Sequence, residues 1–202
     1  MKKIRSGISS SLAAEHQKQR RRRIWLVPLG FLVILFLWVS VNRRSFTAED
    51  LAMGYSYILY QLPLLNVVLL PVMTAVIASR LCDMEIKGNT LKQLYTLQKR
   101  SSFYDWKFIH ELKYLLAFTI GEGIMIPLMG AFCHFTQKLP LPLVFLHVGT
   151  TTLVSLVLLT LQHFLSLMSS NQILPLLVGL IGSFLGLFSM FFPPSAARFV
   201  LW

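Results

Sequence analysis

The sequence predicts an all-α fold, a polytopic membrane protein that crosses the bilayer as five helices. Of its 202 residues, 55% are hydrophobic and only 13% are charged, whereas soluble domains contain about 25% charged residues. The mean hydropathy is +0.64. The apolar residues form long runs, and several reach the roughly 20 residues that an α-helix needs to cross about 30 Å of hydrocarbon.

The basic residues are concentrated in two segments. Eight of the 19 lysines and arginines lie in residues 1–23, and seven lie in residues 80–113. Basic segments are retained on the cytoplasmic side of a membrane, so both are expected to be cytoplasmic. A nucleic-acid site would instead interleave aromatic and basic residues on one folded face. No such pattern is visible despite the net charge of +11, so no nucleic-acid partner is expected.

Residues 1–23 are expected to form a basic cytoplasmic segment, and residues 24–202 to form one transmembrane domain. The first span is predicted at residues 24–41. An export signal is disfavoured because no small-residue cleavage site follows this apolar run. The four arginines at residues 20–23 either contact anionic lipid headgroups, the interpretation we favour, or belong to a nucleic-acid-binding arm.

A short external loop is predicted at residues 42–55, and a second span at residues 55–79. Within the loop, Thr47 and Asp50 have the spacing of a capping box, in which the Thr hydroxyl accepts a hydrogen bond from an amide at a helix start. A helix is therefore expected to begin directly after Thr47.

The second span contains two prolines and one buried amide. Pro63 and Pro71 are expected to kink the helix, because each removes a backbone hydrogen bond. Asn66 lies between them. An amide at this depth is expected to face another helix rather than lipid. It either bonds to that helix or lines a substrate path.

Residues 80–113 form a long polar segment between apolar runs, and we predict a structured cytoplasmic loop. Within it, a semi-apolar helical face recurs at i, i+3, i+4 and i+7: Leu91, Leu94, Tyr95 and Gln98. Ser102 and Asp105 are expected to cap a new helix that leads into the third span. Three aromatic residues fit either an interfacial belt or a docking anchor for a partner: Phe103, Tyr104 and Trp106.

The third span is predicted at residues 114–132 and contains Glu122. A carboxylate near the middle of a membrane is costly, so it is expected to be protonated, paired or exposed to a wet cavity. It is either part of a transport path or a partner in an interhelical bond. Three side chains are candidates for that bond: Asn66, His147 and His163.

The fourth span is predicted at residues 143–167 and the fifth at residues 173–192. His147 and His163 lie near opposite ends of the fourth span, so interfacial or packing roles are expected rather than a joint metal site. Three glycines of the fifth span permit close packing on a neighbouring helix or on a second copy: Gly179, Gly182 and Gly186. The two cysteines, Cys82 and Cys133, are expected on opposite membrane sides, with no disulfide and no zinc spacing.

The polar segment also carries a longer pattern, EIKGNTLKQLYTL at residues 85–97, followed by Arg100 and by FYxxK at residues 103–107. It resembles the cytoplasmic loop of ABC-2-type transporter permeases, in the branch associated with lantibiotic self-immunity and bacitracin export. The matching positions are Glu85, Gly88, Leu91, Lys92, Leu94, Leu97, Arg100, Tyr104 and Lys107. Where the family often has proline, this chain has Gln98.

This resemblance implies that the loop forms a coupling helix that docks on a separate ATP-binding subunit. Leu94 and Tyr95 would be the main anchors, with Lys92 and Arg100 adjusting the charge match. The family has six spans, and the re-entrant stretch before its last span resembles residues 193–199. The sixth span has no counterpart, so the chain is either naturally short or shortened at its C-terminus.

The function that the resemblance implies is that of an exporter membrane subunit in the bacterial cell membrane, with its N-terminus cytoplasmic. The substrate would be an amphiphilic antimicrobial peptide, and a second permease copy or a paralogue would complete the transporter. The sequence has no GxxxxGK[ST] loop, so ATP and Mg²⁺ are expected on the partner ATPase, with no cofactor bound directly.

Two other functions are compatible with a helical membrane protein. One is a non-transporting assembly or scaffold subunit, which the missing sixth span favours. The other is an intramembrane enzyme such as a metalloprotease, which would combine Glu122 with His134, His147 or His163. Such an enzyme needs a His/Glu cluster with ligand spacing, as in HExxH, and the sequence has none.

Overall fold

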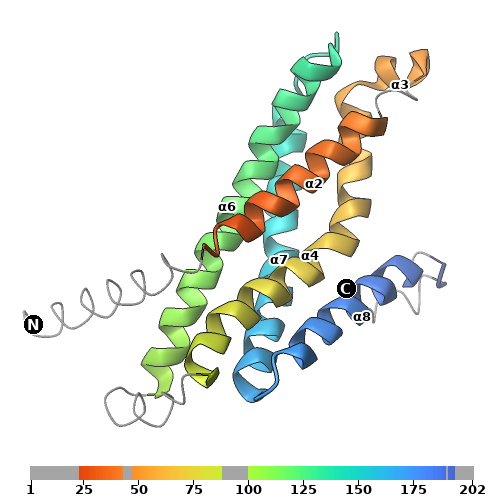
Figure 1. Cartoon of the computed structure of the whole chain (residues 1–202). Helices are drawn as coiled ribbons and strands as arrows, with labels where there is room; N and C mark the ends of the chain where they lie inside the picture. The colour runs from red at the N-terminus through yellow and green to blue at the C-terminus, as the bar shows by residue number, and fades with distance from the viewer. Residues whose placement is uncertain (1–22, 43–46, 88–99, 190, 194–202) are drawn as a thin grey trace, which may run out of the picture.

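The computed structural model describes residues 23–42, 47–87, 100–189 and 191–193. Within these ranges all regular secondary structure is α-helical, which confirms the predicted all-α fold (Figure 1). The helices are α2 (Leu26–Asn42), α3 (Ala48–Met53), α4 (Tyr55–Lys87), α6 (Arg100–Cys133), α7 (Leu141–Met168) and α8 (Ile173–Ser189).

Helix α4 organises the bundle, because it contacts every other described helix. It packs most extensively on α7 and α8, while α6 packs on α7 and on α2. The apolar core lies between α2, α4, α6 and α7, and its fully buried members include Leu35, Ile58, Leu62, Phe118 and Ile126. These side chains come from the first three long apolar runs, which pack on one another through this core.

Helices α7 and α8 bury small and polar side chains and expose large apolar ones. The buried polar residues of α7 are His147, Thr151, Ser155, Gln162, His163 and Ser166. The outward face carries side chains such as Phe145, which is 73% exposed, and Leu153, which is 66% exposed. In water this arrangement would be unfavourable, but in lipid the polar groups must face other helices. The outward faces are therefore lipid-facing.

Three of the described helices are long and apolar enough to cross a membrane, by length and composition: Tyr55–Asp83, Tyr104–Cys133 and Leu141–Met168. Two shorter apolar helices, Leu26–Val41 and Ile173–Ser189, correspond to the first and fifth predicted spans. With about 17 residues each, they are at the lower limit for crossing the hydrocarbon. The chain is a helical membrane protein.

The polar segment at residues 80–113 is more helical than predicted. Helix α4 continues eight residues beyond the predicted end at residue 79, to Lys87. Helix α6 already begins at Arg100, so the prediction that Ser102 caps this helix is wrong. Hydropathy falls where a chain leaves the membrane. The helix does not have to end there, because charged residues with high helix propensity continue its backbone hydrogen bonds. The loop predicted at 80–113 is thus largely an extension of two membrane helices.

The predicted external loop at residues 42–55 contains a short helix. Helix α3 begins directly after Thr47, as the capping pattern predicts, and the amide of Leu51 donates to the carbonyl of Thr47. Gly54 then adopts φ +53°, a conformation that favours glycine, and α4 begins at Tyr55 as predicted. The amide of Tyr55 donates to Gln137 Oε1 at 3.1 Å, which joins this end of α4 to the turn after α6.

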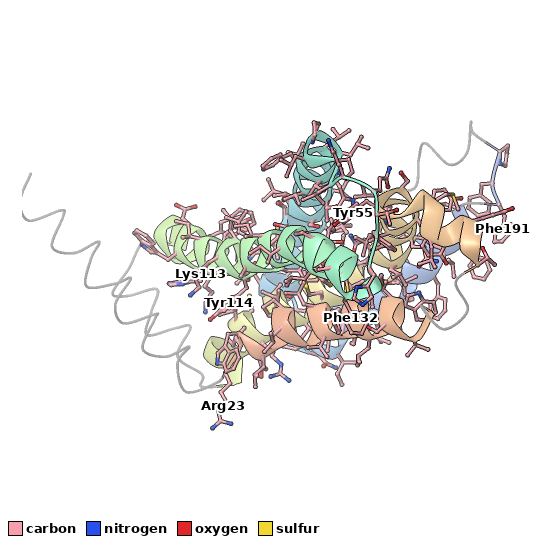
Figure 2. All side chains as sticks on the ribbon, turned by 90° about the horizontal axis from the view of Figure 1, so that it is seen from above. Arg23, Tyr55, Lys113, Tyr114, Phe132 and Phe191 are labelled. Carbon is pink, nitrogen blue, oxygen red and sulfur yellow. The ribbon has the colours of Figure 1, made fainter. Side chains whose placement is uncertain are left out.

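Helix α4 runs through Pro63 and Pro71 without a break and changes direction in its middle (Figure 1). This bend confirms the predicted kink. The start of α2 lies beside α6, and Figure 2 shows Arg23 on the same side of the bundle as Lys113 and Tyr114. We call the end of the bundle where α4 stops at Lys87 and α6 begins at Arg100 the loop end. Helix α2 therefore starts toward the loop end.

Candidate functional site

A buried polar cluster joins α4, α6 and α7. Glu122 lies within α6 and its side chain is completely buried. Its Oε1 accepts a hydrogen bond from Asn66 Nδ2 of α4 at 2.8 Å, and lies 3.1 Å from His147 Nε2 of α7. Of the three partners considered from the sequence, Glu122 thus bonds to Asn66 and His147.

This pairing reduces the cost of placing a carboxylate in the membrane. An isolated buried charge is strongly unfavourable, and a hydrogen-bonded counter-charge or a shared proton offsets much of that cost. His147 can supply either, because its imidazole lies within hydrogen-bonding distance of the carboxylate. Within the described part of the chain, Glu122 Oε2 and Asn66 Oδ1 have no hydrogen-bond partner. Two acceptor oxygens therefore remain available to a polar group.

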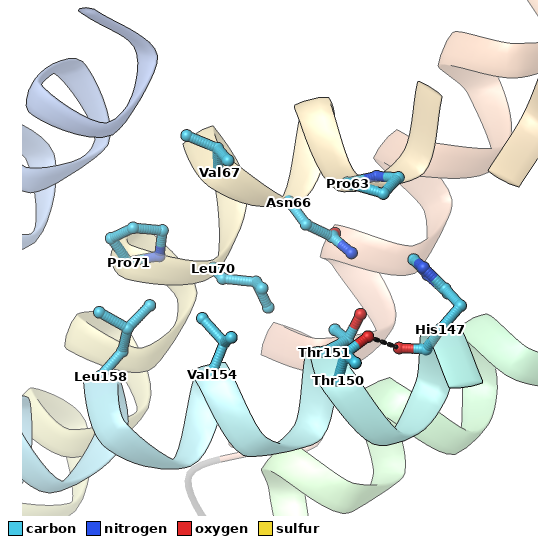
Figure 3. Close-up of a pocket in the computed structure, with 10 residues that line it drawn as sticks. All are labelled: Pro63, Asn66, Val67, Leu70, Pro71, His147, Thr150, Thr151, Val154 and Leu158. Atoms are coloured by element: carbon cyan, nitrogen blue, oxygen red, sulfur yellow. Dashed lines mark hydrogen bonds between the residues drawn. The ribbon is translucent and has the colours of Figure 1, made fainter. Parts of the chain in front are cut away.

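A pocket of about 370 Å³ lies next to this cluster, between α4 and α7 (Figure 3). Its polar lining comes from Asn66, His147, Thr150 and Thr151, and the rest is apolar. The hydroxyl of Thr150 donates to the carbonyl of His147 at 3.0 Å, so it satisfies its own helix. The pocket has the size of a small-ligand site and combines an apolar wall with a few polar groups.

The two prolines of α4 also line this pocket. Each lacks an amide hydrogen, so the helix is locally weakened on either side of Asn66. Gly179 of α8 packs against the same stretch: a Cβ at Gly179 would lie 2.8 Å from the carbonyl oxygen of Pro71 and 2.7 Å from Ala75 Cβ. Gly182 and Gly186 are buried on the same helix. Within the described residues, Gly179 therefore packs on α4 of the same chain and also lies close to Gln162 of α7.

The residues predicted to dock on an ATP-binding subunit are only partly described. Gly88, Leu91, Lys92, Leu94, Tyr95 and Leu97 lie outside the described residues. Glu85 lies in the last turn of α4 and Arg100 is the first residue of α6. Their side chains lie outside the described part of the structure.

Tyr104 and Lys107 point into the bundle instead of outward. The Tyr104 ring packs edge-on against His163, with 4.4 Å between ring centroids, and lies parallel to Phe108. The Lys107 side chain is 1% exposed, and its Nζ donates to the carbonyl of Leu81 in α4 at 2.8 Å. These two residues therefore join α6 to α7 and α4, and the Lys107 ammonium is not presented on the surface of the chain.

A second buried acid was missed in the sequence. Glu111 lies within α6 and is fully buried, and its Oε1 lies 2.8 Å from His163 Nδ1. The expectation that His163 is interfacial or merely packs is therefore wrong. A signal was present: Glu111 and Glu122 are eleven residues apart, which places them within about 20° of each other on one helix face. Both acids thus point toward α7.

The described residues place no third metal-ligating side chain beside Glu122 and His147. His134 lies in the exposed turn after α6, and His163 is engaged by Glu111. The His/Glu constellation that a metalloprotease would need around Glu122 is therefore not assembled among these residues.

One comparison with known proteins identifies a family. The family model described as ABC-2 family transporter protein matches residues 11–186. No curated protein and no solved structure matches the chain. Members of this family are the membrane components of ABC transporters and work with an ATP-binding subunit. Since the match includes all six described helices, except for the last residues of α8, the chain belongs to the ABC-2 family of transporter proteins.

Proposed function

We propose that this permease subunit extrudes an amphiphilic antimicrobial peptide and is driven by a separate ATP-binding subunit that docks on residues 90–107. The observation that carries the proposal is the family match over residues 11–186, which identifies a transporter membrane component. The similarity of residues 85–107 to the coupling loop of peptide-immunity exporters supports the peptide substrate.

The lengths of α4 and α6 support force transmission from the loop end. They contain 33 and 34 residues, and are therefore about 50 Å long. The hydrocarbon core is only about 30 Å thick, so roughly two fifths of each helix extends beyond it. The charged residues at 80–87 and 100–113 place this excess at the loop end. Two continuous helices would thus carry the docking segment away from the membrane.

Side-chain contacts connect these two extensions to the rest of the bundle. The Lys107 ammonium donates to the carbonyl of Leu81, which joins α6 to α4. The Glu111 carboxylate pairs with His163, which joins α6 to α7. A displacement applied to residues 90–107 would therefore move α4, α6 and α7 together rather than bend one helix.

The cytoplasmic orientation of the loop end is part of the proposal. The basic residues at 1–23 and 80–113 favour retention on that side. Arg23 lies on the same side of the bundle as Lys113, which is consistent with one cytoplasmic face for both segments (Figure 2).

The pocket beside Asn66 and His147 supports a site for part of the substrate. A volume of about 370 Å³ holds a side chain or a short acyl segment, but not a whole peptide. The remaining peptide would be bound by a second permease copy or a paralogue, which the family implies in general.

Co-purification tests this function directly. The tagged chain is expressed with the ATP-binding subunit of the same exporter system, and the complex is reconstituted in lipid. Retention of the ATPase, and stimulation of its activity by a lantibiotic-type peptide, are the expected results. A complex whose ATPase does not respond to peptide would instead support a scaffold subunit, and no complex would contradict the docking proposal.

A further inference from the structure

Three metal-ligating side chains meet at the loop end, away from the pocket. They are Cys82 of α4, Glu111 of α6 and His163 of α7, and all three are buried. One ligand atom from each lies within 4.8 Å of the others. These residues are 29 and 52 positions apart in the sequence, which is why no zinc spacing was visible there.

The cluster has unused binding capacity. Glu111 Oε1 and His163 Nδ1 bond to each other at 2.8 Å. The second atom of each group, Glu111 Oε2 and His163 Nε2, has no hydrogen-bond partner in the described part of the chain. Both side chains are completely buried, so leaving these atoms unsatisfied is unfavourable. A cation bound between Glu111 and His163 Nδ1 would replace their hydrogen bond and would also satisfy Glu111 Oε2; His163 Nε2 lies on the far side of the ring and would not bind the same ion.

The donor set selects the ion. A thiolate, an imidazole and a carboxylate are the ligands that Zn²⁺ takes in proteins, at distances of about 2.0–2.3 Å. In a tetrahedral site such ligand atoms lie roughly 3.5 Å apart. The observed separations of at most 4.8 Å are within reach of small side-chain rotations. A thiolate and a carboxylate together carry two negative charges against the two positive charges of Zn²⁺. The buried Lys107 ammonium also interacts with Glu111 and would remain beside the ion.

We propose that Cys82, Glu111 and His163 form a zinc-binding site that joins α4, α6 and α7 at the loop end, with one coordination position left for water or a further ligand. The edges of Tyr104 and Phe108 pack around the imidazole, with ring centroids 4.4 and 5.5 Å from that of His163. These rings would exclude bulk water from the ion. The proposal does not depend on the transported substrate or on the ATPase.

Metal binding by the purified full-length chain tests this site. The protein is prepared in detergent or nanodiscs, stripped with a chelator and titrated with Zn²⁺ or with Co²⁺, which has a visible spectrum. One ion per chain and a thiolate-to-cobalt charge-transfer band are expected. Cys82→Ser should lose the band and weaken binding at least tenfold. The matched control, Cys133→Ser, removes the other buried cysteine and should keep both properties.

A second measurement uses the wild-type chain, so its result does not depend on whether Cys82→Ser folds. Zn²⁺ should slow the alkylation of Cys82 by a membrane-permeant maleimide, while Cys133 in the same molecule reacts at an unchanged rate. The proposal is overturned if the chain binds no ion, if Cys82→Ser retains the cobalt band, or if Zn²⁺ protects neither or both cysteines equally. Each of these results would leave Glu111 and His163 as a metal-free hydrogen-bonded pair.

Discussion

Glu122 joins three helices through one carboxylate oxygen. Its Oε1 accepts from Asn66 Nδ2 and lies 3.1 Å from His147 Nε2, so both partners lie on other helices. A glutamine at this position has nearly the same shape but no charge, whereas a leucine keeps only the volume. The two substitutions therefore separate the electrostatic role of the group from its role in packing.

Glu122→Gln is expected to retain the fold and to reduce peptide resistance. Glu122→Leu should also lose two interhelical hydrogen bonds, which in membrane proteins lowers the free energy of unfolding by about 1–3 kcal/mol in total. Thermal unfolding in detergent and growth in the presence of the peptide measure the two effects. Glu49→Gln, at an exposed acid of α3, is the control. If all variants match wild type in both assays, the buried carboxylate has no such role.

The polar groups of the membrane interior were only partly predictable. Asn66, His147 and Glu122 stand out because apolar sequence surrounds them, and two of the three suggested partners of Glu122 are correct. Glu111 was assigned to a loop because charged residues flank it, and its bond to His163 therefore went unseen. Composition finds a polar residue in an apolar run, but which helices meet at its depth depends on the tertiary arrangement.

At the scale of helices, α8 packs through small residues. Its buried positions are Pro175, Gly179, Gly182, Ser183 and Gly186, and the Ser183 hydroxyl donates to the carbonyl of Val68 in α4 at 2.7 Å. Such a face lets two backbones approach closely, which compensates for the absence of a hydrophobic driving force between helices in lipid.

Gly179→Ala should therefore separate α8 from α4. The new Cβ would lie under 3.0 Å from the Pro71 carbonyl oxygen and from Ala75 Cβ, and relief of such overpacking costs about 1–3 kcal/mol. Gly149→Ala in α7 is the matched control, since nothing lies within 4 Å of its added Cβ. That variant should be neutral or more stable, because alanine favours helix over glycine. Equal unfolding temperatures of the two variants would contradict the close packing.

Helix boundaries within or beside the apolar runs were easier to predict than those in the polar segment at residues 80–113. Tyr55 and Ile173 begin α4 and α8 as expected: Gly54, with its positive φ, precedes α4, and the polar turn at residues 169–172 precedes α8. The C-terminal end of α4 and the start of α6 differ from the prediction, because these helices extend past the apolar runs, to Lys87 and from Arg100. Hydropathy indicates whether a residue lies in lipid or in water. It does not locate the end of a helix, because backbone hydrogen bonds also form outside the membrane.

For the whole molecule, the proposed topology puts the loop end in the cytoplasm. In a background with serine at Cys82 and Cys133, Lys87→Cys should not react with an impermeant maleimide added to intact cells. His134→Cys, in the exposed turn after α6, should react under the same conditions and is the control. If the impermeant maleimide labels position 87 but not position 134, the orientation is the reverse of the proposed one.

The docking proposal predicts that single substitutions at the loop end weaken binding of the ATPase. Leu94→Asp or Tyr95→Ala should abolish peptide resistance and weaken binding of the ATPase, because interface anchors each contribute about 2 kcal/mol or more, or roughly 30-fold in affinity. Membrane insertion should remain normal, since neither residue lies in a predicted span. Co-purification and resistance assays measure both.

A matched control is Tyr60→Ala, because Tyr60 is 80% exposed on α4 near its other end. It should retain both the ATPase and resistance. Variants at residues 94 and 95 that still hold the ATPase and still protect cells would show that the docking site lies elsewhere.

The buried acids of α6 also impose an order on biogenesis. Ribosomes synthesise the chain from its N-terminus, so Glu111 and Glu122 are delivered to the insertion machinery before His163 and His147 exist. At that stage Asn66 is available to Glu122, but the imidazole partner of Glu111 has not been translated. The nascent protein thus lacks the imidazole partners of both buried acids until α7 emerges, and translation of α7 completes these two interhelical bonds.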